Sequence, residues 1–456
     1  MVMMSELNDL LKDINHILQF DYNIRDRYDR VFYTASLLVG LSEKDYDVSA
    51  MDTPDVSRVR QLFKNERQKD YGVTDDVKNN LTDKINQLYN FVNSDDWQGV
   101  DLMGMMSSQF VSNKGKSDNG QVFTPHHIAQ LMADVIDVQA GDVVLDAAAG
   151  DGALLTEALH KNAEAAGIEI DSKVFTLLVA NMLIRKGNWS RLYKSDMLTD
   201  EGKQIVHRLS YDDDGNEKPN AVTKIMLNPP YEKSFHPIDI INNIFDNVKP
   251  GIKAAVLLPD RKLEKEGKKK VRHLLTNNRL VEIIKLPENV FSEGVAVSLF
   301  VFITGETTKD QEVYTVNLKD DGLETVKNGG RQDIHHKWPD IESKLLEIVK
   351  NRDEKAETAK IIKPDLKTLE NLSWPTPVKP FEISSQDFMK TIMDYEMFKQ
   401  GVDVKKLRER IADAVLYDSE IAELNNKILI ELPLKTYKKT FEENRKLQEE
   451  RKMLHE

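Results

Sequence analysis

The chain of 456 residues contains no cysteine and no long uncharged apolar run. Without cysteine there are no disulfides, thiolate metal ligands or cysteine nucleophiles, which is typical of a cytoplasmic protein. Without a long apolar run, the sequence predicts no membrane-spanning helix. Residues 1–10 also lack a basic segment followed by an apolar one, so no secretory signal is expected. These absences favour a cytoplasmic protein that does not associate with a membrane.

Positive charge is also in short supply. The chain has 63 Lys and Arg against 76 Asp and Glu, which gives a formal net charge of -13. A protein that binds DNA by itself usually has a basic surface, because Lys and Arg neutralise the backbone phosphates. If DNA is the substrate, local basic patches or a partner chain must therefore supply the attraction.

What the chain does contain is a central segment in which strands and helices alternate. Residues 1–110 predict a helical N-terminal domain, because their apolar residues recur at helical spacing. Residues 111–305 predict buried strands with intervening helices, the pattern of a doubly wound, mostly parallel α/β sheet. Residues 306–380 predict an irregular or β linker region. Residues 381–456 predict a helical C-terminal region suited to docking on a partner.

Asn228-Pro229-Pro230-Tyr231 follows a short apolar run at residues 225–227 that predicts a buried strand. The two prolines stiffen the turn and leave its carbonyls pointing outward. The Asn228 amide oxygen and the Pro229 carbonyl can accept the two hydrogens of an amino group. The Tyr231 ring can stack on the base that carries this group. The tetrapeptide therefore predicts a grip on a planar group with an exocyclic NH2.

Polar residues fall at the ends of three further predicted strands. Asp146 opens a turn that contains Gly150 and Gly152, whose lack of a side chain lets the backbone approach a ligand. Glu169 ends the next strand and can hold ribose hydroxyls, while Asp196 ends the third and can bond an adenine amino group. Taken singly, the glycine turn is commonly only a tight connection between a strand and a helix, and each acid is commonly a helix cap or a solvated side chain. Together they predict a ligand site, because the carboxyl ends of parallel strands meet at one edge of a sheet.

These motifs resemble those of an S-adenosylmethionine-dependent DNA adenine-N6 methyltransferase. Their order is the same: a Phe-Thr-Pro segment within Gly120–Pro125, the glycine loop, and then Asn-Pro-Pro-Tyr. Leu257–Asp260 and Leu286–Phe291 are similar to later strand-end motifs of this family. Within it, the chain looks most like the methylation subunit of type I restriction–modification systems. The resemblance implies a Rossmann-like methyltransferase domain, S-adenosylmethionine as cofactor and double-stranded DNA as substrate.

The resemblance also implies roles for individual residues. The Asn-Pro-Pro-Tyr tetrapeptide would hold a target adenine flipped out of the duplex, with Phe291 beside it. Four segments would bind the cofactor, and their residues are Phe123, Thr124 and Pro125; Asp146, Gly150 and Gly152; Glu169 and Ile170; and Asp196 and Met197. The family often has Pro where this chain has Ala147, and Tyr where it has Phe123. No metal is expected, and the adjacent His126 and His127 would point apart on a helix.

A basic run follows a later predicted strand and consists of Arg261, Lys262, Lys265, Lys268, Lys269, Lys270 and Arg272. Such a run is commonly a solvated helix face. Its position beside the predicted cleft equally suits contacts with DNA phosphates. From the sequence, both interpretations remain open.

The sequence thus favours a DNA adenine-N6 methyltransferase subunit of a host-defence system. It would rely on a separate specificity subunit, with a restriction subunit as a further expected partner. The acidic net charge and the lack of a recognisable target-recognition domain after residue 306 support that dependence. Three alternatives stay open. They are a self-sufficient methyltransferase that reads DNA with residues 306–456, a protein glutamine-N5 methyltransferase whose substrate amide is also planar, and a catalytically silent assembly subunit.

Overall fold

The computed structural model describes two compact units, Met1–Pro375 and Thr376–Glu456. In the first unit the described residues are 2–19, 27–41, 75–94, 101–111, 124–185, 189–231, 233–291, 295–326 and 330–375. In the second they are short pieces, the longest being 420–424 and 427–431. Phe123, which belongs to the predicted cofactor segment, lies outside the described residues.

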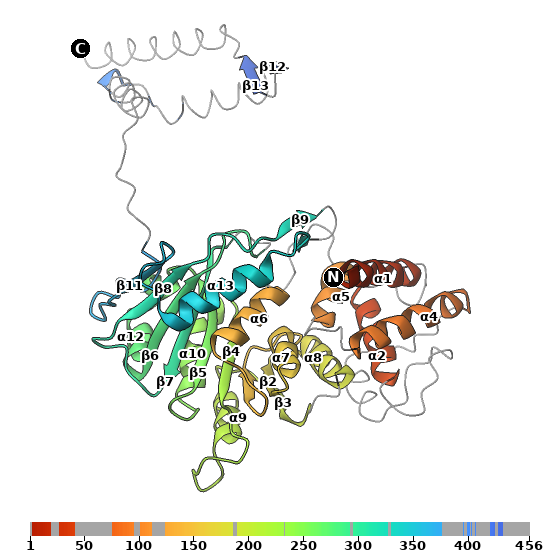
Figure 1. Ribbon diagram of the computed structural model, residues 1–456, viewed down its shortest axis with the longest axis horizontal. Helices are drawn as coiled ribbons and strands as arrows, with labels where there is room; N and C mark the ends of the chain where they lie inside the picture. Colours follow the sequence, from red (N-terminus) through yellow and green to blue (C-terminus); the bar gives the residue numbers. More distant parts are fainter. Residues whose placement is uncertain are drawn as a thin grey trace, which may run out of the picture. The chain divides into compact units, whose positions relative to one another are not determined.

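Within the described residues, the first unit is built on a nine-stranded sheet in the order β11-β8-β6-β7-β5-β4-β1-β2-β3 (Figure 1). Its strands are β1 (Val143–Asp146), β2 (Glu164–Glu169), β3 (Leu192–Lys194), β4 (Lys224–Leu227), β5 (Lys253–Pro259), β6 (Asn278–Lys285), β7 (Val297–Thr304), β8 (Val313–Asn317) and β11 (Ala359–Ile362). Among these strands, β5 with β7, β6 with β7, and β8 with β11 pair antiparallel, while the other five pairings are parallel. The predicted mostly parallel α/β sheet is therefore confirmed.

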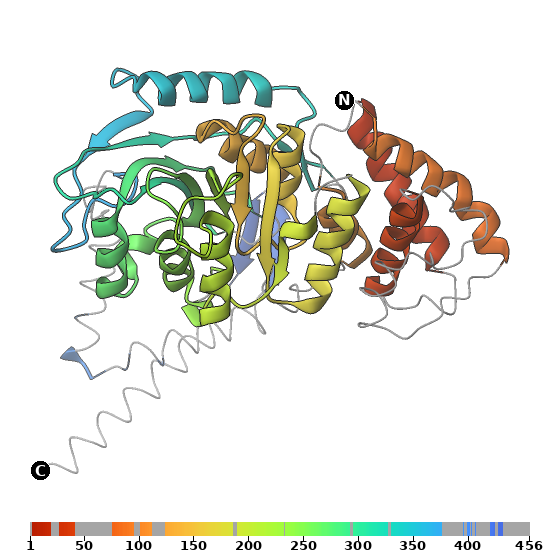
Figure 2. The ribbon, with the colours of Figure 1, turned by 90° about the horizontal axis from the view of Figure 1, so that it is seen from below.

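Successive strand residues face opposite sides of the sheet, and helices cover both sides (Figure 2). Leu145 packs into a core with α9 (Asp200–Ser210), α10 (Pro237–Phe245) and α12 (Lys268–Asn277). Its neighbour Val144 packs into a second core with α6 (His126–Val135), α7 (Ala153–His160) and α13 (Trp338–Asn351). α8 (Ser172–Ile184) packs against α7 and β2. Burial on both faces explains why these strands read as continuous apolar runs.

The order in which successive strands are added to the sheet reverses at β1. β1 pairs in parallel with β2 on one side and with β4 on the other. β2 and then β3 are added to the sheet on one side of β1, and β4 and then β5 are added on its other side. Such a reversal leaves a crevice at the carboxyl ends of the two central strands, where α/β sheets bind ligands. The crevice brings Asp146, the last residue of β1, to the same edge as Asn228, which follows β4.

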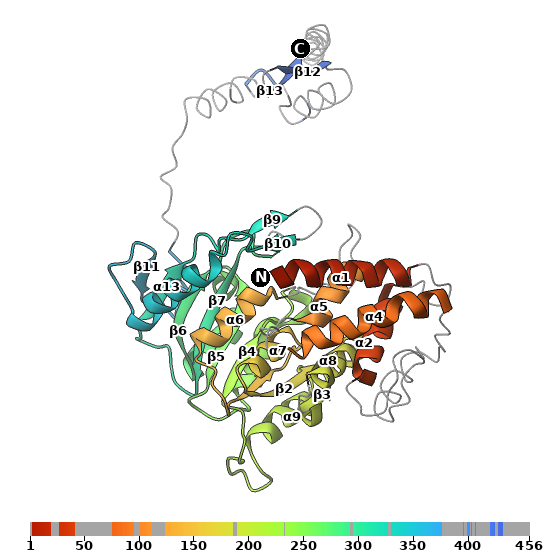
Figure 3. The same ribbon diagram turned by 45° about the vertical axis from the view of Figure 1, so that its right-hand side comes forward.

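Of the N-terminal helices, α2 and α5 pack against α8, and all four share one core with it (Figure 3). They are α1 (Val2–Leu18), α2 (Arg27–Leu41), α4 (Asp75–Val92) and α5 (Leu102–Val111). The core includes Leu177, Ala180 and Ile184 of α8. These helices lie in the same compact unit as the sheet, Met1–Pro375, and the domain boundary near residue 110 stays a prediction. None of the helices in the described ranges is long and apolar enough to cross a membrane.

The sheet also continues past residue 305, where the sequence predicted that the methyltransferase domain ends. β8 joins β6 in parallel and β11 joins β8, while β9 (Glu324–Val326) and β10 (Gly330–Gln332) form a separate pair. The segment Val313–Val316 is buried: Tyr314 and Val316 complete the core under α13, and Val313 packs into the core on the opposite face of the sheet. In the second unit, β12 (Glu420–Leu424) and β13 (Lys427–Glu431) pair antiparallel where a helix was predicted. The rest of the predicted C-terminal helical region lies mostly outside the described residues.

Candidate active site

A cavity of about 710 Å³ lies at the carboxyl ends of β1, β2, β3 and β4. Of the predicted site residues, ten line it: Thr124, Asp146, Gly150, Glu169, Ile170, Asp196, Met197, Asn228, Pro229 and Pro230. Those that do not line it are Pro125, Gly152, Tyr231, Phe291, Lys268, Lys269 and Lys270. The structure thus joins the predicted cofactor segments and the Asn-Pro-Pro turn in one cavity, although they are far apart in the sequence.

The glycine turn after β1 lines this cavity. Asp146 is buried, and its Oδ1 accepts a hydrogen bond of 3.0 Å from the Ala148 amide, which shapes the turn. Gly152 has φ of +102° directly before α7, and a Cβ there would lie 2.9 Å from Leu178 Cδ1. Gly150 has φ of +55°. Gly152 is the position that needs glycine, because other residues rarely adopt φ near +102° and a side chain there would meet Leu178.

Glu169 links the glycine turn after β1 to the segment after β2 through hydrogen bonds. Its Oε2 accepts a hydrogen bond of 2.9 Å from the Gly150 amide, and its Oε1 accepts one of 2.8 Å from the Asp171 amide. Asp171 in turn caps α8 through the amides of Lys173 and Val174. Each carboxylate oxygen has a second lone pair, so Glu169 can still accept hydrogen bonds from a ligand.

The rim of the cavity carries apolar side chains that face water. In the described part of the chain, six large hydrophobic residues are exposed, and three of them line this cavity: Ile170 at 60%, Leu198 at 37% and Phe235 at 42% exposure. Asp196 lies among them, and its Oδ1 accepts a hydrogen bond of 2.8 Å from the Leu198 amide. Exposed apolar side chains around a cavity that also holds a few polar groups are typical of a site that binds a flat ring.

Side chains from other segments of the chain form hydrogen bonds with both ends of the Asn-Pro-Pro-Tyr turn. The Asn228 amide nitrogen donates to Thr124 Oγ1 at 2.8 Å, and Lys262 Nζ donates to the Tyr231 backbone oxygen at 3.0 Å. The Tyr231 ring is half-buried beside the cavity and meets the buried Phe291 ring edge-on, with centroids 6.4 Å apart. The two predicted base contacts therefore lie together, next to the cavity rather than on its wall.

Burial changes the charge of the cavity's acids. It raises the pKa of Asp146 to about 7, and the nearby Glu169 charge adds to the increase. The pKa of Asp151, which also lines the cavity, is raised well above its usual value by burial and by the carboxyl of Asp101. The pKa of Glu169 is raised by burial too. Crowded, partly dehydrated carboxyls of this kind favour a ligand that carries positive charge.

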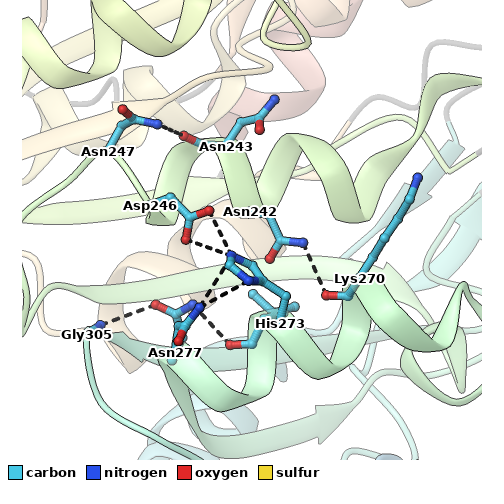
Figure 4. Close-up of polar contacts among 10 residues, drawn as sticks. Asn242, Asn243, Asp246, Asn247, Lys270, His273, Asn277 and Gly305 are labelled. Atoms are coloured by element: carbon cyan, nitrogen blue, oxygen red, sulfur yellow. Dashed lines mark hydrogen bonds and ion pairs between the residues drawn. The ribbon is translucent and has the colours of Figure 1, made fainter.

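The predicted basic run does not reach the cavity. Lys270 lies on α12 and pairs with Asp239 of α10, while its backbone oxygen accepts from the Asn242 amide at 3.2 Å (Figure 4). The same two helices are linked by His273 and Asp246, 2.9 Å apart. Lys268 and Lys269 are exposed. Lys270 therefore holds α12 against α10, while Lys268 and Lys269 face solvent.

Sequence reasoning missed several residues of the site. Asp151, Leu198, Ser234 and Phe235 line the cavity, and Lys262 contacts the turn from the short helix α11 (Lys262–Lys265). Leu198 and Phe235 follow the third strand and the Asn-Pro-Pro turn closely, which is the one signal that pointed to them. Nothing in the sequence distinguished Lys262 from the other cations of its run.

The fold and the cavity define an α/β methyltransferase. A solved type I restriction-modification system methyltransferase subunit from Streptococcus thermophilus has the same fold, with a TM-score of 0.51 and 16% identity over 80% of this chain and 96% of that one. The chain belongs to the N-6 DNA methylase family, whose family model matches residues 100–401. The predicted resemblance to DNA adenine-N6 methyltransferases is thereby confirmed.

Two curated relatives show where the similarity lies. The type II restriction enzyme and methyltransferase RM.BcgI of Heyndrickxia coagulans is 27% identical over 259 residues, which are 50% of this chain and 39% of the relative. The type I restriction enzyme EcoEI methylase subunit of Escherichia coli is 25% identical over 260 residues, or 50% of this chain and 52% of the relative. The chain thus spans about half or less of the length of these relatives.

Proposed function

We propose that the chain transfers a methyl group from S-adenosylmethionine to N6 of adenine in DNA, as the modification subunit of a restriction–modification complex. The observation that carries this proposal is the single cavity in which the Asn228 turn meets the acidic strand ends of β1, β2 and β3. Membership of the N-6 DNA methylase family supports the choice of adenine N6 over a protein glutamine as the acceptor.

The side chains that line the cavity suit S-adenosylmethionine. The exposed side chains of Ile170, Leu198 and Phe235 suit the flat adenine ring of the cofactor. Glu169 would accept hydrogen bonds from ribose hydroxyls, and Asp196 would bond the adenine amino group. The buried acids suit the positive charge of the sulfonium. When bound, the cofactor supplies an already activated methyl group.

The protein's own contribution is to orient the acceptor nitrogen. The Asn228 amide oxygen and the Pro229 carbonyl would accept the two amino hydrogens of the target adenine. These bonds favour a more tetrahedral N6 whose lone pair points at the methyl group, so that reaction requires only alignment. Tyr231, which lies beside the cavity with the buried Phe291 ring against it, would stack on the flipped base, worth roughly 1–3 kcal/mol for each base.

Lys268 and Lys269 are the proposed contacts with DNA phosphates, because both are exposed near the start of α12. Replacing both with Glu should weaken DNA binding by the active complex at low salt and make the slope of log K against log salt shallower by about 1–2 units. Filter binding over a salt series measures both quantities. Replacing Lys344 and Lys350 of α13 with Glu is the control for charge, since both are also exposed but lie on the other side of the sheet. An unchanged slope in the variant of Lys268 and Lys269 removes these two contacts from the proposal.

We infer further that a separate specificity subunit chooses the DNA sequence. The net charge of -13 supports this dependence, since an acidic chain lacks the overall attraction to DNA that a self-sufficient binder has. The test compares the chain alone with the chain co-expressed with the specificity gene from its own locus. Sequencing that detects N6-methyladenine should find one methylated motif only in the second case.

One result would overturn the dependence on a specificity subunit, and another would overturn DNA adenine as the substrate. Efficient methylation of one defined sequence by the isolated chain would show that it needs no specificity subunit. Absence of N6-methyladenine in both cases, although the chain binds S-adenosylmethionine, would contradict DNA adenine as the substrate.

A further inference from the structure

The hydroxyl of Thr124 connects two parts of the cavity that are remote in the sequence. Thr124 precedes α6 and Asn228 follows β4, yet the Asn228 amide nitrogen donates to Thr124 Oγ1 at 2.8 Å. Both residues line the cavity, and Thr124 is only 8% exposed. Water therefore has little access to compete for this hydrogen bond.

The direction of this bond matters for chemistry. A side-chain amide has a donor end and an acceptor end, and only the acceptor end can receive a hydrogen from an amino group. The torsion that turns the amide is broad and roughly two-fold, so it does not choose between the ends by itself. With its nitrogen donating to Thr124, Asn228 directs its oxygen away from Thr124 and keeps it as the acceptor.

The hydroxyl can hold the amide in this direction because it carries one proton and two lone pairs. One lone pair accepts from Asn228, which leaves the proton to be donated elsewhere. An acceptor atom of a ligand in the same cavity can accept a hydrogen bond from this hydroxyl. Thr124 can then no longer donate to Asn228, so the reversed amide loses its partner.

We propose that Thr124 is a positioning residue for Asn228: its hydroxyl fixes the amide so that the oxygen receives the amino group of the target base. This inference rests on the proposed function. It gives Thr124 a task toward the acceptor base in addition to the cofactor contact that the family resemblance implies. Grip on the base and occupation of the cofactor cavity are thereby linked through one side chain.

The test measures how strongly the protein recognises the 6-amino group. The complex that methylates DNA is bound to duplexes whose target is either adenine or purine, which lacks this group, with S-adenosylhomocysteine present. Comparing ratios between variants cancels the cost of unpairing each base. Thr124→Val keeps the shape of the side chain and should lower the adenine-to-purine affinity ratio by about 5-fold, as expected for one lost neutral hydrogen bond. Thr124→Ser keeps the hydroxyl and should restore the ratio.

A second arm shows whether Thr124 acts through Asn228. In the Asn228→Ala background, Thr124→Val should leave the adenine-to-purine ratio unchanged, because no amide remains to be positioned. Calorimetry with S-adenosylhomocysteine and the melting temperature of each variant report cofactor binding and folding separately. The turnover number of Thr124→Val should fall about 5- to 10-fold at saturating cofactor and DNA.

Different results overturn different claims. If Thr124→Val keeps the wild-type ratio and turnover number, or changes only the affinity for S-adenosylhomocysteine, Thr124 does not position Asn228. If Thr124→Val lowers the ratio equally in the Asn228→Ala background, its effect does not pass through the amide. If the wild-type complex forms no N6-methyladenine, the proposed function itself fails, which the Thr124 variants cannot mimic.

Discussion

Replacing Asn228 with Ala should abolish DNA methylation while leaving cofactor binding nearly intact. The substitution removes the amide that would accept an amino hydrogen of the target adenine, so N6 is no longer held with its lone pair toward the methyl group. Loss of one preorganised polar contact in an active site typically lowers the turnover number by on the order of 10²–10³-fold. Transfer of radioactive methyl groups to DNA measures the turnover, and calorimetry with S-adenosylhomocysteine measures binding.

The matched control is Asn247→Ala. Asn247 lies just after α10, where its amide donates to the Asn243 backbone oxygen at 2.8 Å (Figure 4). The control loses an amide of the same kind in the same unit but outside the cavity. It should methylate DNA at the wild-type rate. Turnover like that of the wild type in Asn228→Ala would rule out the proposed mechanism.

Replacing Asp146 with Asn should stabilise the cofactor-free protein and weaken cofactor binding. The folded state holds the pKa of Asp146 at about 7, because the carboxyl is buried and lies near Glu169. The unfolded chain has a pKa near 3.8 for this group. Between these values the folded protein binds the proton and the unfolded chain does not. Folding stability therefore falls as the pH rises from about 4 to about 7, and the neutral Asn escapes this loss.

The gain from Asn should consequently depend on pH. It should be larger at pH 8 than at pH 5 by on the order of 2 kcal/mol, as the shift in pKa implies. Asn can still accept the hydrogen bond from the Ala148 amide, so the turn should keep its shape. Thermal melts without cofactor at the two pH values measure the difference. Cofactor affinity should fall about 10- to 100-fold, because a carboxylate makes the stronger polar contact with a cationic ligand.

Asp213→Asn is the control for the change in charge, since Asp213 is exposed and lies outside the cavity. Its melting temperature should follow that of the wild type at both pH values. If Asp146→Asn melts at the wild-type temperature at pH 8, Asp146 does not have the raised pKa. If its affinity for S-adenosylmethionine is also unchanged, Asp146 does not belong to the cofactor site.

Much of the cavity was predictable because its residues stand at the ends of strands. Asp146, Glu169 and Asn228 each follow an apolar run that had to be buried, and parallel strands bring their carboxyl ends to one edge. The glycine turn was predictable for a similar local reason, since φ of +55° and +102° at Gly150 and Gly152 suits glycine. The extension of the sheet to β8 and β11 was missed, because pairing between distant strands leaves little mark on either one.

The basic run shows the limit of a local pattern. In the sequence its cations look alike, but in the structure Lys262 turns inward to the Tyr231 backbone oxygen and Lys270 pairs with Asp239. Lys268 and Lys269 remain exposed. Which cation bonds which partner depends on how α11 and α12 pack beside the turn and α10, and residue spacing does not contain that information.

The sequence by itself determined the class of fold, the family and the tetrapeptide that would grip the base, because these follow from apolar runs, stiff prolines and motif order. Only the tertiary structure decided which side chains meet. The bond between Thr124 and Asn228, the apolar rim of Ile170, Leu198 and Phe235, and the raised pKa of Asp146 all arise from groups brought together from remote parts of the chain. Distance and burial govern hydrogen bonding and ionisation, and both exist only once the sheet has formed.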